Sequence, residues 1–386
     1  MDAVELLQGL VRIPSPNPPG DTIAVADFVA EQMRAIGCEV RQPAPPQKSK
    51  ARNTIATLGM GEPRVMLHAH IDTVPIGATE AQKWSVDPYA GEVRDGALYG
   101  KGSIDDKAVL ASMMQVMQDA ARQEEQKGLN GTLILVAAAE EEVGGQLGTK
   151  WLADDGHLPV CDFIVVGEQT GNKVATAHKG VLRATVRTTG KSVHATNPDR
   201  GVNAIVAMSK IIAALERYHH DLSRLIHPVV GVPTCNIGLI AGGSTANAVP
   251  DACAIQLDRR MIPGEKPEEV VGELRAVVES LHLEPATASI GDFVYSRWFD
   301  SPLNTDHARC FMDCVRRRLD DDPGPVGYLP GSDAKHLMDL ARGDMIIFGP
   351  GSYEVAHAAD EHVRLEDYAQ TTDILRDFVR RTLYAN

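Results

Sequence analysis

The chain has 386 residues, of which 44% are hydrophobic and 23% are charged, a composition typical of a globular protein with about two domains. Its formal net charge of −14 argues against a nucleic-acid partner or an anionic membrane surface. No run approaches the roughly 18 apolar residues that cross a bilayer. Asp2 and Glu5 stand where a signal peptide would be basic, so we expect a cytoplasmic protein without a membrane partner.

The N-terminal half alternates helix and strand signals. Apolar spacing predicts a helix within residues 1–13 and a second helix that Asp21 caps and Gly37 ends. Three apolar runs without period-2 alternation follow, which is typical of strands buried on both faces of an α/β sheet. These runs are residues 64–67, 132–138 and 163–166, with a predicted helix at 107–117.

Residues 181–290 follow a different plan. The predicted elements have the order βαββαβ, which is that of a ferredoxin-like domain. They are strands at 181–187, 234–240, 253–257 and 287–290, and helices at 202–215 and 267–281. Apolar patterns at 310–319, 345–348 and 368–383 then resume the first style. We therefore predict an α/β domain formed by residues 1–180 and 291–386, with residues 181–290 inserted into it.

The six cysteines are scattered and lack the spacing of a zinc ribbon. Cys310 and Cys314 lie one helical turn apart, which can bring their side chains together. In a chain without a secretory leader we expect both to be reduced thiols.

Candidate metal ligands cluster just after the predicted strands. The carboxyl ends of strands in an open α/β sheet converge on one crevice, so these side chains are expected to meet there. They are His70, Asp72, Glu140, Glu141, Glu142, Glu168 and His357, which Asp105 and Asp106 could join from the start of a helix. Carboxylates gathered in this way repel one another unless a cation neutralises them. Histidine with aspartate and glutamate suits zinc, with manganese or cobalt as alternatives.

Each of these signals alone also has an ordinary structural interpretation. A His-x-Asp pair can lie on the surface, an Asp-Asp pair can cap a helix, and a glutamate triplet can be a solvated face. The triplet directly follows an apolar strand, which argues against the solvated face. His68 would face the same side of a strand as His70 and could compete with it, although the spacing to Asp72 favours His70.

Several motifs in a fixed order extend the signal along the chain. They are His-Ala-His-Ile-Asp-Thr-Val-Pro (68–75), Tyr-Gly-Lys-Gly-Ser-Ile-Asp-Asp-Lys (99–107), Glu-Glu-Glu-Val-Gly-Gly (140–145), Gly-Glu-Gln-Thr (167–170), Gly-Lys-Ser-Val-His-Ala (190–195), Asn-Ala-Val-Pro (247–250), Asp-Arg-Arg-Met-Ile-Pro-Gly (258–264), Gly-Ser-Asp-Ala (331–334), and Phe-Gly-Pro-Gly followed by Ala-His (348–357). From Val4 nearly to the C-terminus, the chain resembles the co-catalytic zinc hydrolases: acetylornithine deacetylase, succinyl-diaminopimelate desuccinylase, aminoacylase-1 and bacterial glutamate carboxypeptidase.

The resemblance implies a metal site with two zinc ions per chain, or cobalt or manganese in their place. His70, Asp105 and Glu168 would hold one ion. Asp105 would bridge to the second ion, which Glu142 and His357 would complete. The resemblance also implies a zinc-peptidase-like catalytic domain with a mixed sheet, and a lid and dimerisation role for the inserted domain.

Further roles follow from the same resemblance. Glu141 matches the general base, and Asp72 matches the carboxylate that orients His70. His194 matches a histidine that reaches the partner subunit's active site and stabilises the oxyanion. The residues that match substrate contacts are Asn247, Arg260, Ser332 and, with them, Asp333.

The sequence therefore predicts a homodimeric hydrolase in which a metal-bridged hydroxide attacks the amide of a small N-acyl amino acid. A metallo-carboxypeptidase or dipeptidase of the same family, with a peptide substrate, is the alternative. A binding protein without catalysis would require a missing ligand or base, and none is missing. A nucleotide-binding protein is disfavoured because no glycine-rich phosphate loop follows the first strand.

Overall fold

The structure is a computed structural model that describes residues 2–322 and 324–384. The chain divides into two compact units. The first consists of residues up to 176, 301–328 and 332 onward, and the second of residues 177–300 with 329–331. Among the described residues, no helix has both the length and the hydropathy needed to cross a membrane.

A mixed sheet forms the centre of the first unit, with strand order β1-β2-β6-β3-β7-β15-β8 and β14 beside β8. Its four middle strands are parallel, and antiparallel pairs flank them. The strands are β1 (Glu39–Arg41), β2 (Thr54–Met60), β3 (Arg64–His70), β6 (Gly131–Ala138), β7 (Phe163–Gly167), β8 (Ala175–His178), β14 (Val326–Tyr328) and β15 (Met345–Phe348). Because the middle strands run in one direction, their carboxyl ends share one edge of the sheet.

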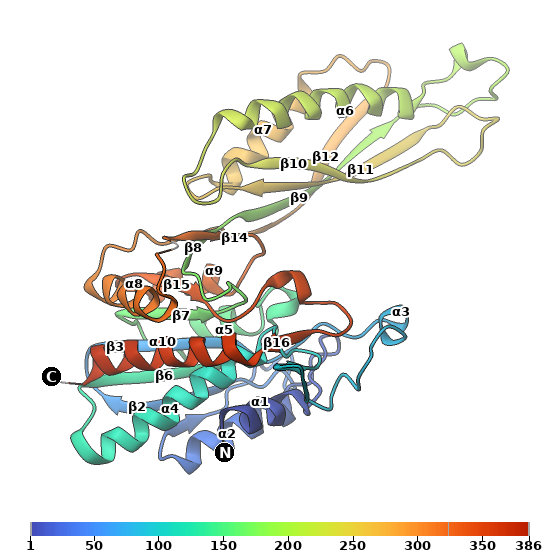
Figure 1. The fold of residues 1–386 in the computed structure, drawn as a ribbon. Helices are drawn as coiled ribbons and strands as arrows, with labels where there is room; N and C mark the ends of the chain where they lie inside the picture. The colour runs from blue at the N-terminus through green and yellow to red at the C-terminus, as the bar shows by residue number, and fades with distance from the viewer. Residues whose placement is uncertain (1, 323, 385–386) are drawn as a thin grey trace. The chain divides into compact units, whose positions relative to one another are not determined.

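Long helices cover this sheet, and α10 packs against both α4 and α8 (Figure 1). The helices are α1 (Ala3–Val11), α2 (Ile23–Ala35), α4 (Lys107–Lys127), α8 (Asp306–Leu319) and α10 (Leu365–Leu383). The shorter helices are α3 (Ala78–Ala81), α5 (Thr149–Asp154) and α9 (Ala334–Leu337), and a small sheet joins β4 (Glu92–Arg94), β5 (Ala97–Tyr99) and β16 (His362–Arg364). Helix α1 begins at a capping box, in which Asp2 and Glu5 each accept a hydrogen bond from the other's backbone N–H.

The second unit contains a four-stranded antiparallel sheet with the order β10-β11-β9-β12, and α6 and α7 pack on it (Figure 1). Its elements are β9 (Gly180–Thr189), α6 (Ala204–Asp221), β10 (Thr234–Gly242), β11 (Ala252–Met261), α7 (Pro267–Glu279) and β12 (Thr287–Ser296). Strand β13 (Phe299–Asp300) pairs with the end of β8. Alternate residues of β9 and β11, among them Leu182, Val186 and Ile255, point into a core shared with the helices.

The predicted α/β class with a mixed sheet is confirmed, but strands such as β2 and β8 were not predicted, and several predicted elements end elsewhere. Strand β3 continues to His70, so the histidines lie on the strand rather than after it. Helix α4 continues past residue 117 to Lys127. The expectation that Asp21 caps α2 is wrong: the capping position is Thr22, and Asp21 Oδ1 lies 3.4 Å from the Ile23 nitrogen.

Candidate metal centre and active site

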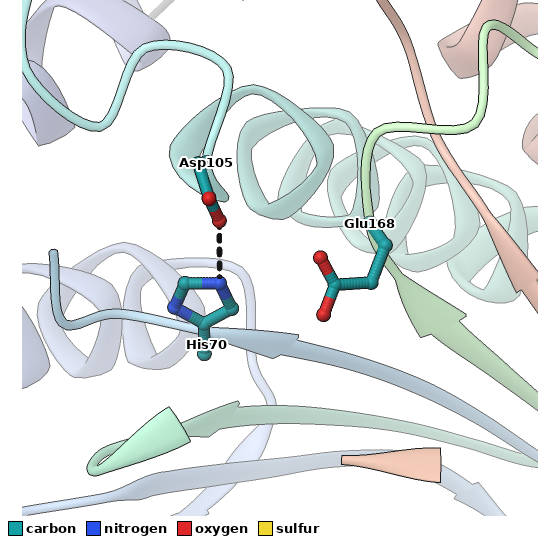
Figure 2. Close-up of side chains that lie close together, drawn as sticks. All are labelled: His70, Asp105 and Glu168. Carbon is teal, nitrogen blue, oxygen red and sulfur yellow. Dashed lines mark hydrogen bonds and ion pairs between the residues drawn. The ribbon is translucent and has the colours of Figure 1, made fainter. Parts of the chain in front are cut away.

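Five side chains from separate segments of the first unit meet at the shared edge of the sheet. One ligand atom each from His70, Asp105 and Glu168 lie within 4.8 Å of one another, and the same is true of Asp105, Glu142 and His357. His70 ends β3, Glu168 follows β7, and Asp105 lies just before α4 (Figure 2). These are the two groups that the sequence resemblance implies.

The first group is buried. His70 Nε2 lies 2.9 Å from Asp105 Oδ1, and the Glu168 carboxylate points toward the pair (Figure 2). His70 Nδ1 lies 3.0 Å from the backbone oxygen of Asp72, which can only accept a hydrogen bond. Burial opposes protonation of His70, but hydrogen bonds with Asp105 and Asp72 outweigh it and raise the His70 pKa well above its usual range. A bound cation would replace the Nε2 hydrogen, leaving the ring hydrogen on Nδ1.

The second group shares Asp105 with the first. Asp105 Oδ2 lies 3.0 Å from His357 Nε2, which is also 3.3 Å from Glu142 Oε2. Asp105 thus directs one carboxylate oxygen to each histidine. A carboxylate with this geometry is suited to bridge two cations.

The Asp72 carboxylate organises the polypeptide around the two groups. Its oxygens accept hydrogen bonds from the backbone N–H groups of Glu141 at 3.1 Å and Glu142 at 3.3 Å. The side-chain amide of Asn17 donates a third at 2.9 Å. Oδ1 also lies 3.6 Å from His70 Nδ1. Asp72 therefore ties the histidine strand to the loop that carries the glutamates.

The three consecutive glutamates have different environments. Glu140 is buried and accepts from Asn17 and Lys48. Glu141 and Glu142 begin a 3-10 helix, and the Glu141 carboxylate lies 3.9 Å from the ammonium group of buried Lys335. The solvated-face interpretation of this triplet is thereby excluded for Glu140.

Burial and crowding perturb these acids strongly. Burial raises the pKa of Glu141 to about 8 and raises the pKa of Glu168 well above its usual range, with neighbouring carboxylates adding to the Glu168 shift. Burial also opposes ionisation of Asp105, but hydrogen bonds with His357 and His70 outweigh it and lower the Asp105 pKa. The hydrogen bond with Asp105 likewise raises the pKa of His357 to about 10. Holding so many acids together costs free energy that a bound cation would offset.

The donor set fits divalent transition metals. Each group offers imidazole nitrogen together with carboxylate oxygen, which is the mixture that zinc, cobalt and manganese accept. Two divalent cations sharing one aspartate would more than offset the three negative charges of Asp105, Glu142 and Glu168. The observed geometry therefore agrees with two metal positions in this unit.

His68 takes a different role from His70. Its Nε2 lies 2.8 Å from Thr149 Oγ1 and 3.7 Å from Asp333 Oδ2, and it belongs to neither metal group. Ser332 is fully buried, and its hydroxyl accepts from the Ala334 N–H. Asp333 accepts a 2.5 Å hydrogen bond from Thr149. The side chains of Ser332 and Asp333, predicted to lie in a loop near the substrate, are thus buried and hydrogen-bonded within the protein.

Asn17 and Lys335 are among the residues near the site that were not predicted from the sequence. Asn17 lies in a proline-rich stretch that signals only a turn, and its partner Asp72 is far away along the chain. Lys335 directly follows the Gly-Ser-Asp-Ala motif (331–334), and this position is the only sequence feature that could have indicated its place near the site.

The remaining predicted residues lie in the second unit. His194 is exposed, and its Nδ1 accepts a hydrogen bond from the Thr196 N–H at 3.2 Å, which leaves Nε2 as the donor of a neutral ring. Asn247 accepts from the Thr245 hydroxyl at 2.8 Å. The partly exposed Arg260 directs Nε to Asp258 at 2.7 Å, and among the described residues its terminal nitrogens have no hydrogen-bond partner, which leaves them for a ligand.

Comparisons with known proteins identify the family and the fold of the chain. The model of the family described as peptidase family M20/M25/M40 matches residues 66–381. An acetylornithine deacetylase of Photorhabdus laumondii is 29% identical, over 99% of this chain and 98% of the relative. An M20 family metallo-carboxypeptidase from Sulfolobus solfataricus has the same fold, with a TM-score of 0.77, 17% identity, and coverage of 98% of this chain and 99% of the other. A dinuclear metal-binding peptidase from Bacillus subtilis has a TM-score of 0.70 and 16% identity, covering 99% and 97% of the two chains.

Proposed function

The chain belongs to peptidase family M20/M25/M40 and is a metal-dependent hydrolase, and on this premise we propose that it removes the acyl group from a small N-acyl amino acid. The single observation that carries the proposal is the pair of ligand groups that share Asp105. The deacetylase relatives, similar over nearly the whole chain, support an N-acyl amino acid as the substrate.

His70, Asp105 and Glu168 would hold one zinc ion, and Asp105, Glu142 and His357 the other. When bound, the two ions would acidify water and polarise the scissile carbonyl. Glu141 takes a proton from the attacking water and delivers it to the leaving amine. Asp72 keeps the proton-transfer group in place, because it accepts hydrogen bonds from the backbone of both Glu141 and Glu142.

The second unit contributes His194, Asn247 and Arg260, while Ser332 and Asp333 belong to the first unit. His194 donates Nε2–H to the oxyanion, in agreement with the tautomer that Thr196 imposes. Arg260 binds a substrate carboxylate through its terminal nitrogens, and Asn247 contacts the substrate beside it. Ser332 and Asp333 shape the substrate loop from within.

We also propose a homodimer formed along β10. This strand is an edge of its sheet and exposes Leu239 and Ile240, and Val206 of α6 is exposed as well. Unpaired edge strands with apolar side chains favour association with another chain. Both β10 and β12 are such edges, but Ile205 and Val206 of α6, which packs against β10, extend the exposed apolar surface on the β10 side. Leu239→Lys should convert the dimer to monomers in analytical ultracentrifugation, whereas Tyr295→Lys on the opposite edge strand β12 should not.

A hydrolysis screen tests the activity. The zinc, cobalt and manganese forms should release amine from N-acetyl and N-succinyl amino acids, N-acetylornithine among them, and the Glu141→Gln protein should not. The peptidase alternative, favoured by relatives such as the metallo-carboxypeptidase, predicts instead that dipeptides and C-terminal peptide bonds are cleaved faster. A wild-type protein that binds both metals and cleaves neither class would refute the proposed function.

A further inference from the structure

Tyr328 contacts a proposed metal ligand from outside the metal groups. Its hydroxyl lies 2.8 Å from Glu168 Oε2, and both residues are buried. Among the described residues, Tyr328 is the one hydrogen-bond donor to the Glu168 carboxylate. Tyr328 ends the short strand β14, far along the chain from Glu168, and no motif of the sequence points to it.

Gln169 shows which way this hydrogen bond runs. Tyr328 oxygen is also 2.8 Å from Gln169 Oε1, while Gln169 Nε2 is buried and, among the described residues, has no partner. A hydroxyl has one hydrogen and cannot donate to Glu168 and to Gln169 together. An amide fits the same space in two orientations that exchange its oxygen and nitrogen.

Rotating the Gln169 amide by half a turn removes both the second acceptor of the Tyr328 hydroxyl and the buried N–H without a partner. Its N–H then donates to the Tyr328 oxygen, and the Tyr328 hydrogen is directed to Glu168. The atom left without a partner becomes a carbonyl oxygen, and an unsatisfied carbonyl is tolerated better than an unsatisfied N–H. The contacts therefore form one chain of donors, Gln169 to Tyr328 to Glu168.

We propose that Tyr328 is a positioning residue, oriented by Gln169, that occupies one oxygen of Glu168 and leaves the other for the metal shared with His70 and Asp105. The inference rests on the proposed two-metal function. Ligating carboxylates are generally held by such outer partners, and loss of one typically weakens metal binding about 10–100-fold. The second position, formed by Asp105, Glu142 and His357, lacks Glu168 and should be less affected.

Tyr328→Phe tests the proposal, because it removes only the hydroxyl. Tyr368→Phe is the matched control. Tyr368 is also buried, but it lies on α10, and its hydroxyl donates to the Ala3 backbone oxygen at 2.7 Å instead of to a metal ligand. Metal-free proteins would be titrated with zinc against a chromophoric chelator. We expect Tyr328→Phe to raise one of the two zinc dissociation constants about 10–100-fold. Tyr368→Phe should leave both dissociation constants unchanged.

A spectroscopic readout separates positioning from general destabilisation. Visible absorption of the cobalt form reports ligand geometry and should change in Tyr328→Phe but not in Tyr368→Phe. Gln169→Met should shift the same dissociation constant in the same direction, which keeps the test available if Tyr328→Phe folds poorly. Unchanged affinity and spectrum in folded Tyr328→Phe or Gln169→Met would overturn the inference, whereas a wild type without metal would refute the proposed function itself.

Discussion

Asn17 and Asp72 are joined by a buried hydrogen bond of 2.9 Å from the Asn17 amide to Asp72 Oδ2. The second hydrogen of the same amide reaches Glu140 Oε1, also at 2.9 Å. One amide thus separates two carboxylates that would otherwise repel each other. Asp72 also accepts hydrogen bonds from the backbone of Glu141 and Glu142. Hydrogen bonds therefore link the N-terminal loop, through Asp72, to the proposed base Glu141.

Replacing Asn17 with alanine should affect both stability and catalysis. Asp72 and Glu140 would each lose one donor but keep their others, and a hydrogen bond to a charged group contributes about 1.5–3 kcal/mol. We expect a lower free energy of unfolding in urea and a lower kcat, because the glutamate loop loses part of its support. Wild-type values for both quantities would show that Asp72 needs no help from the N-terminal loop.

The two adjacent glutamates should separate base from ligand. Glu141→Gln keeps the size of the side chain and removes proton transfer, so turnover should fall about 10²–10⁴-fold while both metals stay bound. Glu142→Ala should instead weaken one metal position. Kinetics and elemental analysis on the same preparations check this, and an exchange of the two phenotypes would mean that the roles in the triplet are shifted by one residue.

Much of this site could be predicted from the sequence because each proposed ligand lies beside a strong local signal. Apolar runs identified the strands that end at His70 and precede Glu142 and Glu168, and parallel strands bring such ends together. The spacing to Asp72 then favoured His70 over His68. These short-range patterns identify the candidate ligands, whereas their division into two groups and the role of each residue came from the resemblance to known hydrolases.

The missed features depend on contacts between distant segments. Asn17 and Tyr328 act on partners that no local pattern connects to them. Strands β4, β5 and β16 have three residues each, too few for periodicity to register. Helix α4 extends past residue 117 because Ala120 and Ala121, whose small side chains give a weak apolar signal, continue its buried face.

Metal content should approach two equivalents per chain in the supplemented protein. Removing the metals with a chelator should lower the free energy of unfolding, because a ligand at 100 times its dissociation constant stabilises a fold by about 2.7 kcal/mol. Titration calorimetry and thermal unfolding of metal-free and reloaded protein check this. A ceiling of one metal with full activity would contradict the bridging role of Asp105.

Cys310 should be the most reactive thiol of α8. A hydrogen bond from Cys314 lowers the pKa of Cys310 to about 6, with the Arg381 guanidinium adding to the effect, and the pKa of Cys314 is raised in turn. Since the thiolate is the nucleophile, alkylation of Cys310 by iodoacetamide should rise with pH through about 6 and level off by neutrality. Mass spectrometry of the native protein measures this, and Arg381→Gln should move the midpoint upward.

Buried thiols provide the contrast. Burial raises the pKa of Cys161 to about 12 and that of Cys235 to about 11, so both should stay unmodified until the protein is unfolded. A Cys310 rate that keeps climbing to pH 9, as for an ordinary thiol, would contradict the lowered pKa.

His194 tests the proposed oxyanion role together with the proposed dimer. The residue is exposed in the second unit, and Thr196 holds its ring with Nε2 as the donor. Loss of one oxyanion donor costs about 10²–10³-fold in turnover. His194→Ala should therefore lose activity at this scale while keeping both metals, since the residue belongs to neither ligand group.

Mixing two inactive variants shows whether the histidine crosses between subunits. In a dimer of His194→Ala with Glu141→Gln, the first chain keeps Glu141 and receives His194 from its partner. That site is complete, and the other lacks both groups. Random exchange of equal amounts makes half of the dimers mixed, each with one active site, so about a quarter of the wild-type activity should return. If activity stays absent although labelled subunits demonstrably exchange, His194 acts within its own chain or has no catalytic role.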